Sequence, residues 1–336
     1  MKVDSGFGGS LDEVPARARA LEEAGYDGAF SAETNHDGFL PLAVAATATE
    51  RIELGTSIAV AFARTPMITA ITANDLQLAS KGRFVLGLGS QIKPHIERRF
   101  SMPWSAPAAR MREYVMAMRA IWAAWHEGTK LDFRGDFYSH TLMTPFFSPG
   151  ASEYGPPKVW LAAVGEKMTE TAGEVCDGLI AHGFTTERYL REVTIPALER
   201  GLRKAGRARD PFELTGPIFV VSGANEEQLE AAKKGTRQQI AFYGSTPAYR
   251  GVLELHGWGE LGDELNKMSK RGLWVEMGEE IDDDVLDAFA VVAEPDEVAG
   301  KLRARFGGIL DRISFYMPYQ ANPDATQAVI AELKGA

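Results

Sequence analysis

The sequence predicts an α/β protein in which about eight parallel strands and the helices that follow them close into a (β/α)8 TIM barrel with insertions. Short, nearly continuous apolar runs alternate with helix-like segments along most of the chain. Strands that are apolar on both faces and separated by helices indicate a parallel sheet with helical cover. A doubly wound open sheet is the alternative arrangement of the same elements.

The N-terminal half starts the alternation at once. The stretch MKVDSGF is a short strand, and Ser10 is expected to cap the next helix, with Glu13 completing a capping box. That helix ends near Ala24, because Gly25 follows it. The next expected elements are the strands 27–32, 51–60, 84–89 and 158–163 and the helices 66–80 and 106–125.

The C-terminal half continues the same pattern. A helix near 168–176 leads into Asp177-Gly178 and a strand, which echoes the helix, Asp27-Gly28 and strand near the N-terminus. We interpret this echo as one repeated βα unit. The remaining expected elements are a helix over 187–205, strands over 212–221 and 312–317, and a helical stretch over 226–289.

Two segments interrupt the alternation inside what we expect to be a single domain over residues 1–336. Residues 130–157 read as a hairpin followed by a loop rich in proline and glycine, which is long for a connection in a barrel. Residues 244–278 form a helical insertion with several glycines. We expect both insertions to lie over the active-site mouth.

Composition narrows the class of partner. The formal net charge is −10, which argues against nucleic acid or anionic lipid as the main partner. Cys176 is the only cysteine, so no internal disulfide can form, and its helical surroundings favour a core position. The N-terminal residues lack the apolar core of a signal peptide. We therefore expect a cytoplasmic protein with a small-molecule substrate.

The stretch SKGRFVLGLGS ends a buried strand in Gly89-Ser90, at the end where barrels place their ligands. A dinucleotide turn would need a third glycine at the position of Ile92. A Walker-type phosphate loop would need a lysine after the glycine, and Ser90-Gln91 stands there. The glycines therefore mark either a plain turn or a phosphate site of another kind.

A second glycine occupies an analogous place, between the strand 158–163 and the next helix. The first backbone N–H groups of that helix, from Gly165 to Met168, point outward and can bind a phosphate with the help of the helix dipole. Lys167 adds positive charge there, and Glu166 opposes it. Two such sites on neighbouring strands favour a phosphate-bearing cofactor.

These residues resemble the bacterial luciferase-like monooxygenase superfamily, in particular its branch of oxidoreductases that depend on the deazaflavin coenzyme F420. The order and spacing of the motifs fit over about residues 1–185, and residues 289–319 are similar to the family's closing helix and strand. The motifs that carry the resemblance are Ala24 to Gly28, Leu54 to Ile58, Gly82 to Ser90, Phe133 to Gly135, and Pro157 to Gly165.

The resemblance implies a TIM barrel that binds F420, usually as a homodimer. In similar enzymes the third strand carries a non-prolyl cis peptide whose bulge backs the deazaflavin ring, and that bond corresponds to Ser57-Ile58 here. FMN is the alternative cofactor, in a monooxygenase on the same barrel. The implied cofactor-binding residues are Thr56, Ser57, Ile58, Gly89, Ser90, Val164, Gly165, Glu166, Lys167 and Met168.

The chain departs from one branch of the family. In its sugar-phosphate dehydrogenases, strand two ends in Asp-His and a glutamate follows the fourth-strand glycines. Here Ala32-Glu33 and Ile92 stand at those places, so oxidation of glucose 6-phosphate is not expected. The chain is more similar to other F420-dependent oxidoreductases, which leaves the substrate and the direction of hydride transfer open.

Hydride transfer needs a nearby proton donor or acceptor, and Glu33 and His36 follow the second strand. We predict that they form this catalytic pair, with capping of the helix near Pro41 as the alternative. His182 ends a later strand and is expected to be a structural histidine. A metal-dependent hydrolase finds little support, because the six histidines are scattered and no metal motif is present. A flavin-binding protein without catalytic activity is a third possibility.

Overall fold

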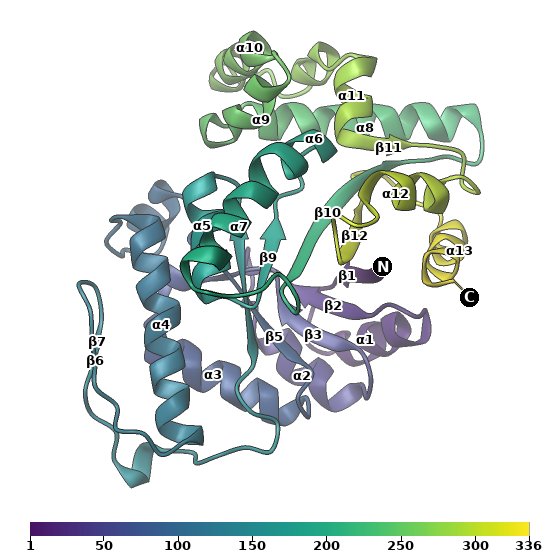
Figure 1. The fold of residues 1–336 in the computed structure, drawn as a ribbon. Coiled ribbons are helices and arrows are strands. Elements are labelled where there is room, and N and C mark those ends of the chain that lie inside the picture. Colours follow the sequence, from purple (N-terminus) through teal and green to yellow (C-terminus); the bar gives the residue numbers. More distant parts are fainter. Residues whose placement is uncertain (336) are drawn as a thin grey trace.

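Eight parallel strands form a closed sheet in the computed structural model, which describes residues 1–335 (Figure 1). Each barrel strand pairs with its neighbours in parallel, and the last pairs with the first to close the circle. The predicted (β/α)8 barrel is therefore confirmed. In order around the barrel the strands are β1 (Lys2–Gly6), β2 (Gly28–Ser31), β3 (Glu53–Thr56), β5 (Phe84–Gly89), β8 (Lys158–Ala163), β9 (Gly178–Ala181), β10 (Glu213–Val221) and β12 (Arg312–Tyr316).

Helices surround this barrel and bury the outer faces of its strands. Every residue of β2, β5 and β9 is buried, as the apolar runs in the sequence predict. No helix within residues 1–335 combines the length and the apolar character needed to cross a lipid bilayer. The longer helices around the barrel are α1 (Val14–Glu23), α2 (Leu40–Ala48), α3 (Pro66–Ala79), α4 (Pro107–His126), α5 (Glu166–Val175), α7 (Ile195–Lys204), α8 (Glu226–Gly244), α12 (Val298–Phe306) and α13 (Pro323–Lys334).

Cys176 belongs to the core, as predicted. The side chain is fully buried directly after α5. Burial raises the pKa of its thiol to about 12, which keeps the sulfur protonated at neutral pH. A protonated, inaccessible thiol is not a nucleophile.

The predicted capping box at the first helix is wrong. Ser10 lies in a turn, where its carbonyl accepts a hydrogen bond from the Glu13 N–H at 3.0 Å. Helix α1 begins only at Val14, with Pro15 in its first turn and no side-chain cap. The Glu13 carboxylate pairs with Arg17 at 2.8 Å instead of reaching back to Ser10.

The first insertion contains the predicted hairpin, formed by β6 (Phe133–Arg134) and β7 (Ser139–His140). The Glu113 carboxylate of α4 accepts backbone hydrogen bonds from Asp136 and Phe137 and so ties the hairpin tip to that helix. Figure 1 shows the hairpin along the outer side of α4. A role over the active-site mouth stays a prediction for this segment.

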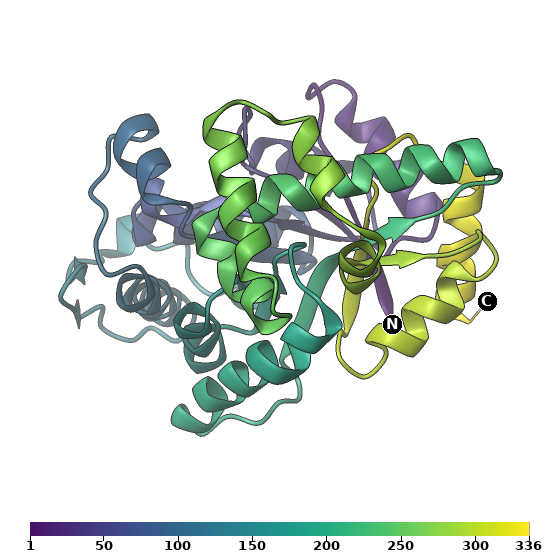
Figure 2. The ribbon, with the colours of Figure 1, turned by 90° about the horizontal axis from the view of Figure 1, so that it is seen from above.

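The second insertion belongs to a larger helical segment, which confirms the helical stretch expected over 226–289. Figure 1 shows it at one end of the molecule, next to the ends of β9 and β10, and Figure 2 shows it from above. After it, β11 (Ala290–Val292) pairs with the last residues of β10. The segment consists of α8, α9 (Arg250–Leu255), α10 (Gly259–Lys270) and α11 (Asp283–Phe289).

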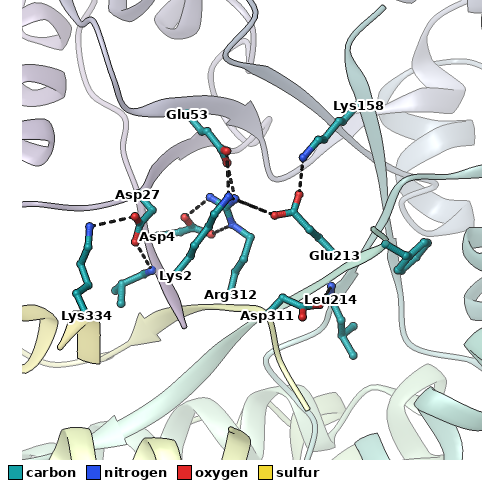
Figure 3. Close-up of polar contacts among 12 residues, drawn as sticks. Lys2, Asp4, Asp27, Glu53, Lys158, Glu213, Leu214, Asp311, Arg312 and Lys334 are labelled. Atoms are coloured by element: carbon teal, nitrogen blue, oxygen red, sulfur yellow. Dashed lines mark hydrogen bonds and ion pairs between the residues drawn. The ribbon is translucent and has the colours of Figure 1, made fainter. Parts of the chain in front are cut away.

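A network of charged side chains fills the opposite end of the barrel, where the strands begin (Figure 3). Its centre is Arg312, which is fully buried and donates hydrogen bonds to both carboxylate oxygens of Asp4, at 2.6 and 2.8 Å. Arg312 also pairs with Glu53 and Glu213. Lys2 and Lys158 complete the network from its rim, at 3.1 Å from Glu53 and 3.0 Å from Glu213 respectively.

Two aromatic side chains form a layer next to this network. The Trp160 and Phe30 rings stack with centroids 5.5 Å apart, and the Arg312 guanidinium lies 5.1 Å from the Trp160 ring. Burial alone would lower the pKa of Arg312, but its hydrogen bond to Asp4 and the charges of the nearby carboxylates raise that pKa above its usual value. Arg312 is therefore a permanent cation beneath the aromatic layer.

Replacement of Arg312 by methionine is expected to destabilise the protein by about 3–5 kcal/mol, because Asp4 would remain buried without a partner. Urea unfolding followed by circular dichroism measures this change. Lys158→Met is the matched control. It should cost less than about 1 kcal/mol, since Lys158 is half exposed. Equal stability of R312M and the wild type would contradict the account.

Candidate active site

A cavity of about 440 Å³ lies inside the barrel, where Phe30, Trp160 and Asp4 of the ion network contribute to its lining. Parallel barrels bind their ligands at this end, where the strands finish. Residues from several strands therefore face one space that opens to solvent. Its lining includes Ser5, Phe30, Ser57, Trp160, Ile180 and Pro217.

A larger groove of about 650 Å³ lies between the beginnings of α8 and α13. Val298 and Val329 of the outer helices contribute to its lining, so it lies outside the barrel wall. Its only charged lining residue is Glu227. We place the chemistry in the barrel cavity, because the strand ends bring their polar backbone and side chains together there.

The third strand is interrupted where the cavity begins. The sequence predicts one strand over 51–60, but β3 ends at Thr56 and pairing resumes only at β4 (Ala59–Val60). Between them lies a cis peptide bond joining Ser57 to Ile58, at the position that the family resemblance implies. The strand therefore bulges beside the cavity, and Ser57 lines it.

Thr56 takes the place of the missing backbone pairing between β3 and β5. Its hydroxyl donates to the Gly87 carbonyl at 2.7 Å and accepts from the Gly87 N–H at 3.0 Å. A Cβ atom on residue 87 would lie 1.9 Å from the Thr56 carbonyl oxygen. The first glycine of Gly87-Leu88-Gly89 is therefore required by this close approach of two strands.

Gly89 makes room for the bulge itself. A Cβ atom there would lie 2.8 Å from Cγ1 of Ile58. The next residue, Ser90, donates its hydroxyl hydrogen to the Gln91 carbonyl at 3.1 Å, and Gln91 has a φ of 58°. Sequence reasoning assigned these glycines to a phosphate and missed that they also accommodate Thr56 and Ile58.

Glu33 holds the bulge in place through its backbone and its side chain. Its backbone N–H donates to the Ile58 carbonyl at 3.1 Å, and its carboxylate accepts from the Val60 N–H at 2.7 Å. The same carboxylate oxygen pairs with Arg64 at 2.6 Å. Glu33 is 8% exposed and thus fixes both ends of the bulge from a buried position.

The structure does not join Glu33 to His36. His36 is exposed, and within residues 1–335 no hydrogen bond connects the two side chains. Neither residue caps α2. Asp37 accepts hydrogen bonds from the N–H groups of Phe39 and Leu40 instead, at 2.7 and 2.9 Å. The predicted capping alternative therefore belongs to Asp37, and the predicted catalytic pair stays a prediction.

Helix α5 begins with an open N-terminus. Gly165 is its N-cap, and among residues 1–335 no side chain accepts a hydrogen bond from the first turn. A Cβ atom on Gly165 would meet nothing within 4 Å. Glu166 pairs with Arg200 at 2.5 Å, which offsets the opposing charge expected from the sequence. The backbone N–H groups of Glu166, Lys167 and Met168 are therefore available to an anion.

The residues expected to hold a cofactor follow three neighbouring strands, because β3 pairs with β5 and β5 pairs with β8. Thr56 ends the first strand and Ser57 and Ile58 follow it, Gly89 ends the second and Ser90 follows it, and Val164 to Met168 follow the third. Of these residues Ser57 lines the cavity, and a cofactor-binding role of the set stays a prediction. Arg64 is an addition that sequence reasoning missed, since no motif links it to Glu33, 31 positions away.

The sequence pattern of luciferase-like monooxygenases matches residues 2–312. The chain belongs to the luciferase-like monooxygenase family. It is 56% identical over 313 residues to an uncharacterized protein of Mycobacterium tuberculosis, covering 93% of this chain and 92% of that one. It is also 27% identical to the 5,10-methylenetetrahydromethanopterin reductase of Archaeoglobus fulgidus, with 86% of this chain and 85% of the reductase aligned.

A solved structure supports the fold. The coenzyme F420-dependent tetrahydromethanopterin reductase of Methanopyrus kandleri superposes with a TM-score of 0.77 at 20% sequence identity. The superposition covers 98% of this chain and 96% of that one. This family member is therefore built on the same barrel as an F420-dependent reductase.

Thr56→Val is expected to lower the free energy of unfolding by about 2–4 kcal/mol, because it leaves both the N–H and the carbonyl of Gly87 without partners in a buried place. Thr56→Ser keeps the hydroxyl and should cost clearly less. Urea unfolding of the two variants and the wild type measures the difference. Equal stability of T56V and T56S would show that the hydroxyl does not hold the strands together.

Proposed function

We propose that the protein is an oxidoreductase that exchanges a hydride between coenzyme F420 and a small organic substrate. The observation that carries the proposal is the break of the third strand between β3 and β4, where Ser57 lines the cavity, with the open N-terminus of α5 two strands away. The similarity to an F420-dependent reductase of the same fold supports this choice.

The geometry fits a cofactor with a tricyclic ring and a phosphate. Ser57 and Ile58 would back the ring, because the bulge borders the cavity. The N–H groups from Gly165 to Met168 would bind the phosphate, and Ser90 lies at the end of the strand between the two. Thr56 would act indirectly, by holding the bulge in place.

Bound F420 would supply the hydride chemistry, and the protein would supply binding, orientation and a dry site. Phe30 and Trp160 stack on each other and give the cavity an apolar surface. Glu33 and Arg64 keep the bulge in one position. We assign no further residue to the binding and orientation of the cofactor.

FMN is the alternative cofactor. It also carries a phosphate and a tricyclic ring, and the family of this chain is described as luciferase-like monooxygenases. The groups described above serve either molecule, so binding has to be compared directly. The predicted homodimer and the predicted cytoplasmic location stay predictions, as does a small molecule as substrate.

The open helix terminus provides the first test. Gly165→Asp should weaken F420 binding at least about ten-fold, because a carboxylate would occupy the phosphate position. The helix itself should remain stable, since aspartate is a favourable N-cap and the φ of −84° suits any residue. Equilibrium titration followed by the fluorescence of F420 measures the dissociation constant.

Gly165→Ala is the matched control and should bind F420 within a few-fold of the wild type, because its Cβ meets no neighbour. The same titrations with FMN decide between the cofactors. If the wild type prefers FMN, the monooxygenase alternative replaces the proposal. If G165D binds F420 as tightly as G165A does, the phosphate lies elsewhere.

Glu33 and His36 can be separated by their expected effects. Glu33→Gln should weaken F420 binding as well as turnover, because it loosens the bulge that backs the ring. His36→Asn should lower kcat with little change in F420 affinity if His36 moves the proton. Steady-state kinetics and F420 titrations of both variants give these values. Unchanged kcat in H36N would remove His36 from the mechanism.

A further inference from the structure

The cavity mouth has two unlike sides. The groups suited to the cofactor follow β3, β5 and β8, and the strands β9, β10 and β12 form the other side of the closed barrel. Aromatic side chains from the second side and from the helical segment after β10 gather there. The four polar members of this group, which we name the aromatic wall, are His182, Tyr243, Tyr249 and Tyr316.

The wall lies at the ends of two strands whose earlier residues line the cavity. His182 directly follows β9, two residues after the lining residue Ile180, and Tyr316 ends β12, two residues after the lining residue Ser314. A Cβ on Gly183 would lie 3.2 Å from the Tyr316 ring, which shows how closely the two strand ends approach.

His182 is held in a defined orientation. Its ring lies 4.5 Å from the Tyr249 ring and 4.8 Å from the Tyr243 ring, measured between centroids. Its Nδ1 accepts a hydrogen bond from the Phe184 N–H at 3.0 Å. A ring nitrogen that accepts carries no proton, so in the neutral ring Nε2 carries it.

The Nε2–H group of His182 remains free for a ligand. Within residues 1–335 this nitrogen has no hydrogen-bond partner. It also does not belong to the buried polar atoms without a partner, and it therefore reaches solvent. His126 and His140 differ, because their unpartnered Nε2 atoms are buried. The expected structural role of His182 therefore accounts for one ring nitrogen and leaves the other available.

The surroundings keep His182 neutral. Burial lowers the pKa of its imidazole to about 4, and the rings packed on it belong to Tyr243 and Tyr249, whose pKa values burial raises. Tyr243 also shares a hydrogen bond of 2.8 Å with Tyr316, so these hydroxyls are partnered with each other. Within residues 1–335 the wall contains no charged side chain, and its donors without a hydrogen-bond partner include two neutral groups, the His182 Nε2–H and the Tyr249 hydroxyl.

We propose that the Nε2–H of His182 donates a hydrogen bond to the oxygen of a neutral carbonyl or alcohol substrate whose apolar body lies against the tyrosine rings. This inference rests on the proposed F420-dependent function and names its substrate class. A wall without cations does not suit a phosphorylated or carboxylate substrate. A neutral ketone or the matching secondary alcohol fits it.

Reduced F420 would supply the two electrons for reduction of the carbonyl group. In the direction of reduction, the carbonyl carbon receives a hydride from the reduced deazaflavin, and the π electron pair of the C=O bond moves onto oxygen. That oxygen then takes a proton from solvent, which gives the alcohol and the oxidised cofactor. The His182 Nε2–H keeps its proton and stabilises the negative charge that develops on oxygen.

The experiment compares three forms of the full-length protein: the wild type, His182→Phe, which keeps an aromatic ring without a donor, and His182→Gln, whose amide places a donor near the position of Nε2. Each is titrated with F420 and then assayed for reduction of a panel of small ketones, including cyclohexanone and acetophenone, with reduced F420. We expect unchanged F420 affinity in all three. The kcat/KM of H182F should fall about ten-fold, and that of H182Q should stay within about three-fold of the wild type.

A second measurement on the wild type does not depend on the folding of a variant. Nitrogen-15 NMR of histidine-labelled protein should show His182 as the neutral Nε2–H form from pH 5.5 to 8, and its Nε2 signal should shift when a ketone is added to the F420 complex. Titration of His182 near its usual pKa of about 6.5 would overturn the proposal. So would full activity of H182F, or the absence of both turnover and a signal shift over the whole panel while F420 binds. Failure of the wild type to bind F420 would instead reject the proposed function.

Discussion

The buried pairing of Arg312 with Asp4 is the constraint on which the rest of the barrel depends. Three positive side chains, Lys2, Lys158 and Arg312, meet three negative ones, Asp4, Glu53 and Glu213, where the strands begin. A charge so far from water stays only where partners surround it. The network therefore links β1, β3, β8, β10 and β12 and sets their positions relative to one another.

The functional end of the barrel is built on this layer. The Arg312 guanidinium supports Trp160, whose stacking on Phe30 gives the cavity an apolar surface. Above it, Thr56 and Glu33 hold the bulge of the third strand through hydrogen bonds to Gly87 and Val60. The side of the mouth proposed for the cofactor thus consists of backbone that side chains hold in place. The opposite side consists of the aromatic wall around the neutral His182. A ring cofactor and a neutral substrate would meet between them.

Sequence patterns predicted the barrel well, because doubly buried strands are apolar runs wherever they occur, as β5 and β9 show. They placed the cis bond at Ser57-Ile58 only through a family motif, since no periodicity signals it. These patterns failed where the role of a residue depends on a partner far away in the sequence. The partner of Glu33 is Arg64. Gly87 and Gly89 are needed because Thr56 and Ile58 leave no room for a Cβ atom, whether or not a ligand binds there. The free nitrogen of His182 follows from a backbone hydrogen bond that no sequence reveals.

The most direct test of the central claim is a crystal structure of the protein with F420 bound. The account predicts that the deazaflavin ring lies against the Ser57-Ile58 bulge and that phosphate oxygens accept hydrogen bonds from backbone N–H groups between Gly165 and Met168. The other face of the ring should then be turned toward His182. A cofactor phosphate bound away from α5, or a ring that does not touch the bulge, would contradict the account.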